Sequence, residues 1–219
     1  MSRRSWVLTI AFLGLACARG TPAREDAQAD TVRLKVSVFN DARVPQPVLR
    51  AAELRARAVF AEAKLSLVWL DCGTPGHWHT ELGCQDVAFP SHLSVRLATG
   101  VPAGSGDIFG QSFLDERGEG SYVNVYLTPL ASAKALEILR EGDLLGCVIA
   151  HELGHLLLGK SSHSEEGLMR ARWEARELRE AAKGNLLFSK SETERMRVRY
   201  RSATALAQGD VARLRPAGS

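Results

Sequence analysis

The residues with the clearest chemical potential are two histidines and a glutamate in the run H-E-L-G-H. His151 and His155 are four residues apart, so a helix would place both imidazoles on one face, about one turn from each other. Imidazole nitrogen is a common ligand of Zn²⁺, and two such rings can reach one ion. Glu152 lies further round the helix, where its carboxylate can hold a water beside the metal. The spacing predicts one zinc ion, a zinc-activated water, and Glu152 as general base and then general acid.

The helix that carries this run is expected to be buried, because its other positions are apolar. Burying Glu152 and two histidines without a function would be costly, which argues against an ordinary amphipathic helix. Gly154 in a helix interior costs about 1 kcal/mol relative to alanine, so we expect another group to pack closely against it. The apolar positions are Leu144, Leu145, Val148, Ile149, Leu153, Leu156 and Leu157.

The third protein ligand must come from beyond this helix. Gly159 can end the helix by taking a left-handed conformation, after which the chain turns. His163 then arrives eight residues after His155, and Gly167-Leu168-Met169 follows.

Residues 151–173 resemble the metzincins, zinc peptidases whose motif is H-E-x-x-H-x-x-G-x-x-H followed by a methionine turn. They are also similar to a group of little-characterised exported bacterial proteins with H-E-L-G-H-L-L-L and a following H-S. The resemblance implies that His163 is the third ligand and that Met169 supports the metal. Here Gly159 comes one residue late and His163 two residues late, so the link must bulge to bring His163 back to the metal.

Glutamates further along the chain provide an alternative third ligand, as in thermolysin-like zincins. Glu174 and Glu177 lie 19 and 22 residues past His155, on an expected helix. Several arginines surround them, which favours a solvated helix face. A carboxylate ligand would also leave His163 and Met169 unexplained.

Three cysteines are candidates for a disulfide or for metal binding. Cys72 and Cys84 bracket a loop, and we expect them to form a disulfide. With His77 and His79 between them, a second zinc site is the alternative. Cys147 lies one helical turn before His151; we expect a small buried hydrophobic residue there, and a thiolate ligand is the alternative.

The first 18 residues have the pattern of a removable signal peptide. Arginines are followed by a short apolar core and by Ala16-Cys17-Ala18, which fits a cleavage site. The apolar run is too short for a spanning helix, so we expect a secreted or periplasmic protein. The alternative is a lipoprotein of the cell envelope, with a lipid anchor at Cys17. Residues 19–30 are polar and small and predict a disordered leader.

The remaining chain must position the histidines and the glutamate. Alternating apolar residues predict strands, and the alanine- and leucine-rich run predicts a helix. Gly142 is expected to end one helix and Asp143 to cap the next. Ser189 begins a capping box. The expected strands are 31–39, 65–70, 92–98 and 122–127, the region 99–121 is irregular, and the expected helices are 48–64, about 130–141, 143–158, 173–183 and one from 189.

The strand at residues 122–127 is the clearest in the chain. Tyr122, Asn124 and Tyr126 share one of its faces. By resemblance, residues 121–127 are assigned as the edge strand that pairs with an extended peptide substrate beside the zinc.

These expectations amount to a zinc endopeptidase with an α/β (α+β) fold: a mixed sheet and the active-site helix, then a mainly helical C-terminal part. We expect one catalytic domain at 31–208, a flexible tail at 209–219 and a monomer. The net charge of +3 is spread along the chain, so nucleic acid is not an expected partner, and no segment is apolar enough to span a membrane. The rival class is a non-catalytic, zinc-stabilised envelope or binding protein.

Overall fold

The computed structural model describes residues 32–74, 77–78, 83–104, 108–131 and 138–214. The predicted signal peptide, the leader at 19–30, Cys17 and His79 lie outside the described residues. Within the described ranges, no helix has both the length and the apolar content needed to cross a membrane.

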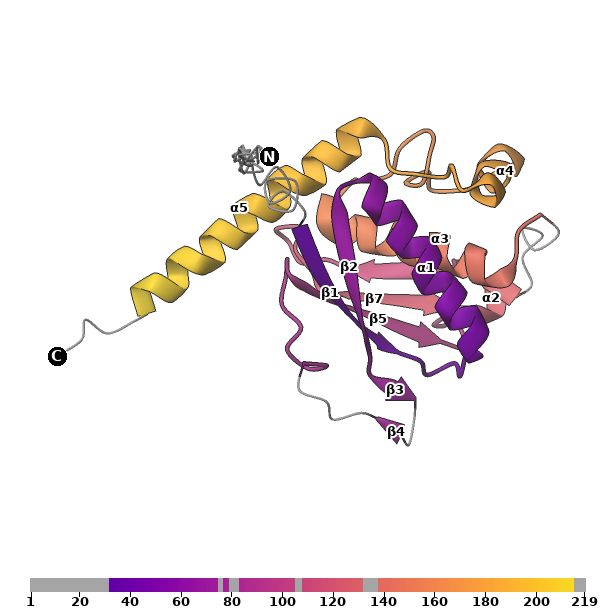
Figure 1. Cartoon of the computed structure of the whole chain (residues 1–219), viewed down its shortest axis with the longest axis horizontal. Coiled ribbons are helices and arrows are strands. Elements are labelled where there is room, and N and C mark those ends of the chain that lie inside the picture. The colour runs from indigo at the N-terminus through magenta and orange to yellow at the C-terminus, as the bar shows by residue number, and fades with distance from the viewer. Residues whose placement is uncertain (1–31, 75–76, 79–82, 105–107, 132–137, 215–219) are drawn as a thin grey trace, which may run out of the picture. The chain divides into compact units, whose positions relative to one another are not determined.

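A five-stranded mixed sheet forms the centre of the fold (Figure 1). Its order is β2–β1–β5–β7–β6, and the first four strands are parallel to one another. Only β6 runs antiparallel, against β7. The strands are β1 (Val32–Phe39), β2 (Leu65–Asp71), β5 (His92–Ala98), β6 (Gly110–Phe113) and β7 (Tyr122–Tyr126). A separate pair joins β3 (Gly73–Thr74) to β4 (His77–Trp78).

Five helices accompany the sheet in the part of the chain that the structure describes. They are α1 (Gln46–Glu62), α2 (Leu127–Ala131), α3 (Glu141–Leu158), α4 (Ala175–Lys183) and α5 (Lys190–Leu214). Helix α1 connects the parallel strands β1 and β2, and α3 packs against α1, β6, β7 and α5. The predicted α/β class, with a mixed sheet followed by a mainly helical C-terminal part, is confirmed.

Close contact between α1 and α3 depends on two glycines of α3. A Cβ at Gly142 would lie 2.6 Å from the Ala51 Cβ, and one at Gly146 would lie 2.5 Å from the Ala52 carbonyl oxygen. The sequence predicts that Gly142 ends a preceding helix. In the structure Gly142 lies in the first turn of α3 instead. Asp143 is not the N-cap either; it lies inside α3 and pairs with Arg55 of α1.

The helix boundaries at the C-terminal side follow the predictions closely. Helix α3 ends at Leu158, and α4 ends at Lys183. The predicted capping box is present: Ser189 Oγ accepts from the Glu192 N–H, and a Glu192 carboxylate oxygen accepts from the Ser189 N–H. Helix α5 runs to Leu214, so the tail predicted from residue 209 begins as helix.

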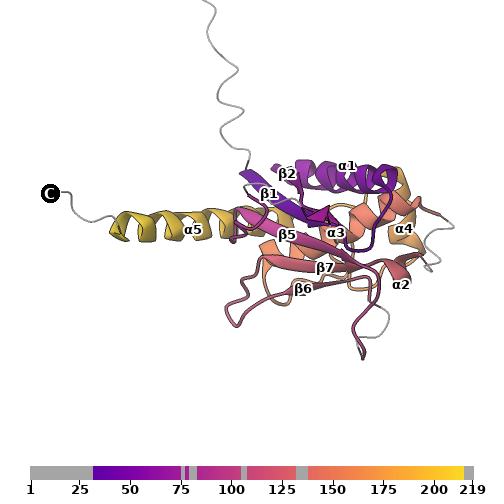
Figure 2. The same ribbon diagram turned by 90° about the horizontal axis from the view of Figure 1, so that it is seen from below.

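The prediction that residues 121–127 form an edge strand is wrong, because β7 has neighbouring strands on both sides. It pairs with β5 on one side and with β6 on the other, so its main chain has no free edge (Figure 2). Tyr122, Asn124 and Tyr126 therefore cannot line a strand that a peptide joins. Strand β6 lies in the region predicted to be irregular and occupies the edge of the sheet instead.

Candidate metal centre

Three imidazoles converge at the C-terminal half of α3. His151 and His155 come from α3 itself, and His163 comes from the loop that follows it. One nitrogen from each ring can be chosen so that all three lie within 4.8 Å of one another. The link after Gly159 therefore bulges as the sequence analysis required, and His163 lies beside the other two rings. In the described part of the chain, no carboxylate joins this group.

The loop between α3 and His163 is shaped by unusual backbone conformations. Gly159 ends α3 with φ 82° and ψ −163°, and its N–H donates to the His155 carbonyl. The positive φ was predicted, but the ψ is not that of a left-handed helix; this combination is accessible mainly to glycine. Ser161 also has a positive φ, of 53°. These turns return the chain toward α3 and bring Ser162 inside, where it is 4% exposed.

The outer nitrogens of the two α3 histidines are held by neighbouring groups. His151 Nδ1 lies 2.7 Å from the Leu168 carbonyl oxygen, and His155 Nδ1 lies 2.6 Å from Ser162 Oγ. A carbonyl can only accept, so His151 Nδ1 carries the proton and its Nε2 presents a lone pair. The Nε2 atoms of His151 and His155 are 3.0 Å apart. Rings whose Nδ1 atoms are held from outside and whose Nε2 atoms point toward one shared position are the usual arrangement around bound zinc, so these residues fit the ion.

Burial keeps both α3 histidines in the neutral form that binds metal. Burial lowers the pKa of His151 to about 4, although the hydrogen bond to the Leu168 carbonyl opposes the shift. Burial, together with the smaller effect of the other two imidazoles, lowers the pKa of His155 to about 3. Neither ring carries a positive charge at neutral pH, and the neutral form is the one that ligates a metal.

A tight turn beneath the histidines presents the Leu168 carbonyl. The Ser164 N–H donates to the Met169 carbonyl, and Gly167 takes a φ of 79°. Trp173 Nε1 donates to the same Leu168 oxygen at 3.0 Å, and its ring meets the His151 ring edge-on. The role of the Leu168 carbonyl is not predictable from the sequence, because a main-chain acceptor leaves no signal in residue type.

Met169 supports the helix that carries the histidines. It is fully buried, and a Cβ placed on Gly154 would lie 2.7 Å from its Sδ. The same Cβ would lie 2.8 Å from a ring carbon of Phe188. The prediction that another group packs closely against Gly154 is confirmed.

Glu152 is buried beside the edge strand β6. It is 6% exposed, and burial raises its pKa to about 7, although a hydrogen bond from Ser112 opposes the shift. Ser112 Oγ lies 2.6 Å from Glu152 Oε2. A Cβ on Gly110 would lie 2.5 Å from the Glu152 Cγ, so the glycine leaves the space that the carboxyl side chain occupies. Neither β6 residue was identified from the sequence.

The glutamates offered as alternative ligands are engaged elsewhere. Glu177 is 2% exposed, accepts from Arg170 Nη1 at 2.8 Å, and closes a capping box with Glu174 at the start of α4. Glu177 is therefore not on a solvated face, as the sequence analysis favoured, but is buried in an ion pair. Glu174 is the N-cap of α4 and pairs with Arg170.

The cysteines also have defined partners or surroundings. Cys72 and Cys84 form the predicted disulfide, so their sulfurs are not ligands of a second zinc site. Cys147 is fully buried in the hydrophobic core, as expected, and burial raises the pKa of its thiol to about 12.

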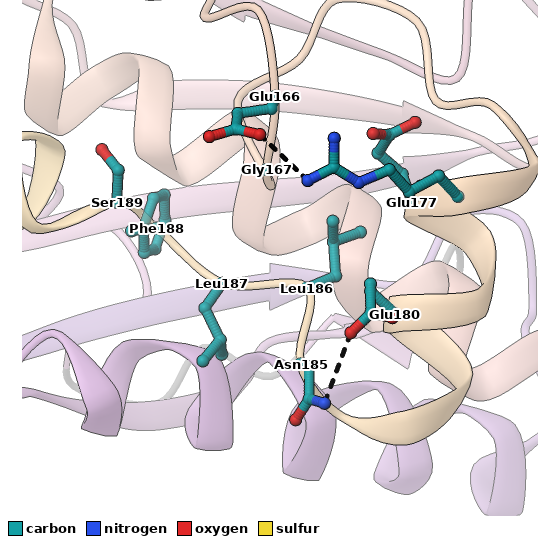
Figure 3. A pocket seen from close by; sticks show the side chains of 10 residues that line it. Glu166, Gly167, Glu177, Glu180, Asn185, Leu186, Leu187, Phe188 and Ser189 are labelled. Carbon is teal, nitrogen blue, oxygen red and sulfur yellow. Dashed lines mark hydrogen bonds and ion pairs between the residues drawn. The ribbon is translucent and has the colours of Figure 1, made fainter.

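A pocket of about 440 Å³ lies beside the turn that contains Gly167, and none of the three histidines lines it (Figure 3). Its walls come from that turn, from α4 and from the segment 185–189. An ion pair joins Arg176 to Glu166, and a hydrogen bond joins Asn185 to Glu180, among the residues that line it.

Comparison with solved structures finds distant similarities, among them two peptidases. No family model matches the chain, and no curated protein sequence matches it. A zinc-dependent peptidase from Methanocorpusculum labreanum has 13% identity and a TM-score of 0.48, over 74% of this chain and 99% of its own. Archaemetzincin from Methanopyrus kandleri has 17% identity and a TM-score of 0.49, over 77% of this chain and 96% of its own. The functional assignment therefore rests on the geometry of the site.

Proposed function

We propose that this protein is a zinc-dependent endopeptidase of the metzincin type. The observation that carries the proposal is the convergence of His151, His155 and His163, with ligand nitrogens within 4.8 Å of one another. Two of the Nδ1 atoms are held, and a buried carboxyl follows the first histidine directly. A site of three histidines leaves one position of a tetrahedral ion for water or substrate, which is the pattern of catalytic rather than structural zinc.

The residues of the chain would divide the chemistry between binding and proton transfer. His151, His155 and His163 would hold the ion through one imidazole nitrogen each. Bound zinc supplies Lewis-acid polarisation of a carbonyl and lowers the pKa of water from about 15.7 to about 7. Glu152 accepts a proton from the attacking water and returns it to the leaving amine, and no covalent intermediate forms.

An extended peptide would bind along the free edge of β6. The Tyr126 N–H donates to the Phe109 carbonyl, so these two residues form a hydrogen-bonded pair of the antiparallel ladder. Such pairs recur at every second residue along each strand. The main-chain groups of Gln111 and Phe113 then face β7, and those of Gly110 and Ser112 face outward. Strand addition there would place substrate beside Glu152 through main-chain hydrogen bonds. Strand β6 thus takes the role that the sequence analysis gave to residues 121–127.

Two alternatives are less well supported. A thermolysin-like ligand set would need Glu174 or Glu177 to leave its capping box and its ion pair with Arg170. A non-catalytic, closed zinc site would need a fourth protein ligand, and Cys147 is buried in the core as a neutral thiol. A hydroxamate chelator separates the two kinds of zinc site, because it can bind and protect only an ion with an open position.

Export is part of the proposal. The signal-like residues 1–18 support it, and so does the Cys72–Cys84 disulfide, because disulfides persist in oxidising compartments. Intact-mass measurement of protein recovered from a bacterial envelope fraction distinguishes cleavage after Ala18 from a lipid-modified Cys17.

The decisive experiment compares the parent protein with Glu152→Gln. Both should bind about one zinc per chain, and only the parent should cleave an unfolded protein substrate. Glu62→Gln, at the exposed end of α1, is the matched control for loss of a carboxylate and should cleave like the parent. Equal cleavage by Glu152→Gln and the parent would contradict the proposed role of Glu152.

A further inference from the structure

Strand β6 is built around the side chain of Glu152. Ser112 Oγ lies 2.6 Å from Glu152 Oε2 and 2.9 Å from the Glu152 main-chain oxygen. Two positions earlier on the same face of the strand, Gly110 leaves space that a Cβ would close: it would lie within 2.5 to 2.7 Å of three Glu152 side-chain atoms. One residue of β6 therefore holds the carboxyl group, and another makes room for it.

We propose that Ser112 is a positioning residue for Glu152, fixing its carboxyl group relative to a substrate docked on β6. The inference rests on the proposed function, because it deepens the role of Glu152 in peptide hydrolysis. Ser112 acts through Glu152, to whose carboxyl group its hydroxyl is hydrogen-bonded.

The hydrogen-bond geometry suits both forms that Glu152 takes in the reaction. A serine hydroxyl carries one proton and can also accept. While Glu152 is a carboxylate, Ser112 donates to Oε2. Once Glu152 has taken a proton from water, Oε2 can donate to Ser112 Oγ, and the serine can turn its own proton to the Glu152 main-chain oxygen, 2.9 Å away. Glu152 Oε2 and the Ser112 hydroxyl therefore keep each other as partners in both forms, and the carboxyl group need not move between them.

The place of Ser112 in the sheet connects this contact with substrate binding. Its main-chain groups face the free edge of β6, where an extended peptide would pair. Its side chain faces α3 and Glu152. The same residue would therefore set the position of the docked peptide and the position of the general base. Errors of about 1 Å in such an arrangement can cost about 100-fold in rate.

Steady-state kinetics on the zinc-loaded enzyme test the proposal. Ser112→Ala should lower kcat by about 10- to 100-fold and change KM by less than about twofold, because the peptide pairs with main chain that the variant retains. Ser112→Thr keeps the hydroxyl and should recover most of the lost kcat. Ser66→Ala, a partly buried serine on the distant strand β2, is the matched control and should behave like the parent. A Ser112→Ala enzyme with unchanged kcat, or with a change confined to KM, would overturn the proposal.

A second readout does not depend on activity. In metal-free protein, Ser112→Ala should lower the Tm when Glu152 is present, and should lower it clearly less in a Glu152→Ala background. Equal shifts in the two backgrounds would show that the side chains are not coupled and would overturn the proposal. The two failures are distinguishable: a zinc-loaded parent that cleaves nothing sinks the proposed function itself, whereas an active parent with a fully active Ser112→Ala variant sinks only the role of Ser112.

Discussion

Ser162 Oγ lies 2.6 Å from His155 Nδ1, and this contact gives the long loop after α3 a chemical role. The run from His155 to His163 is two residues longer than the metzincin motif that it resembles. The longer link both returns His163 to the other two histidines and buries a hydroxyl against the outer nitrogen of His155. Groups in that position orient a ligating ring and fix its tautomer.

Ser162→Ala should weaken zinc binding by about 10- to 100-fold, because it removes the partner of His155 Nδ1. Competition with a chelator of known affinity measures the change. Ser161→Ala alters an exposed serine of the same loop and should bind zinc as the parent does. Equal affinities for the parent and Ser162→Ala would show that the contact does not orient His155.

Gly154→Ala should destabilise the protein, although alanine is the better helix former by about 1 kcal/mol. The new methyl group would meet Met169 Sδ at 2.7 Å and Phe188 at 2.8 Å. Overpacking of this kind costs about 1–3 kcal/mol, so the free energy of unfolding should fall in denaturant titrations. Gly100→Ala is the control, since nothing lies within 4 Å of its added Cβ, and it should change stability little. A Gly154→Ala protein with a higher free energy of unfolding than the parent would show that Met169 does not pack tightly against α3 at Gly154.

The Arg170–Glu177 pair should make stability depend on pH in acid. Burial raises the pKa of Glu177, but hydrogen bonds from main-chain N–H groups and from Arg170 outweigh it, so the pKa lies below its ordinary value of 4.5. The unfolded chain then takes up this proton at higher pH than the folded one. The stabilising contribution is complete above the unfolded pKa and is lost as pH falls through the folded pKa.

The difference in unfolding free energy between the parent and Glu177→Gln isolates this group, because the other titrating groups are common to both proteins. The parent should be the more stable at pH 6, and its advantage should shrink as pH falls toward 3. An advantage that stays constant over this range would show that the Glu177 pKa is not lowered.

The parts of the fold that depend on local pattern could be predicted from the sequence. The strand at His92–Ala98 and the end of α3 at Leu158 were predicted at these residues, because alternation and an apolar helix ending in glycine are local signals. Strand β6 was missed because it has four residues, begins with Gly110, and takes its conformation from pairing with β7. The predicted start of α3 is two residues too late, because glycine is typical of a position just after a helix. In the structure Gly142 lies inside α3 and lets α1 pack closely against it.

The site divides in the same way. His151, Glu152 and His155 were identified from spacing along one helix, and His163 only through a resemblance. Ser112 and Ser162 were missed, because serine is common and small and their roles arise from segments distant in sequence or from a bulged loop.

The measurement that tests the ligand set most directly is the zinc content of single variants after purification. The account predicts about one zinc per chain for the parent, for Glu174→Ala and for Glu177→Gln, and a loss of tightly bound zinc for His163→Ala. Circular dichroism should show all four proteins folded. Zinc retained by His163→Ala but lost from either glutamate variant would contradict the three-histidine site and favour a carboxylate as the third ligand.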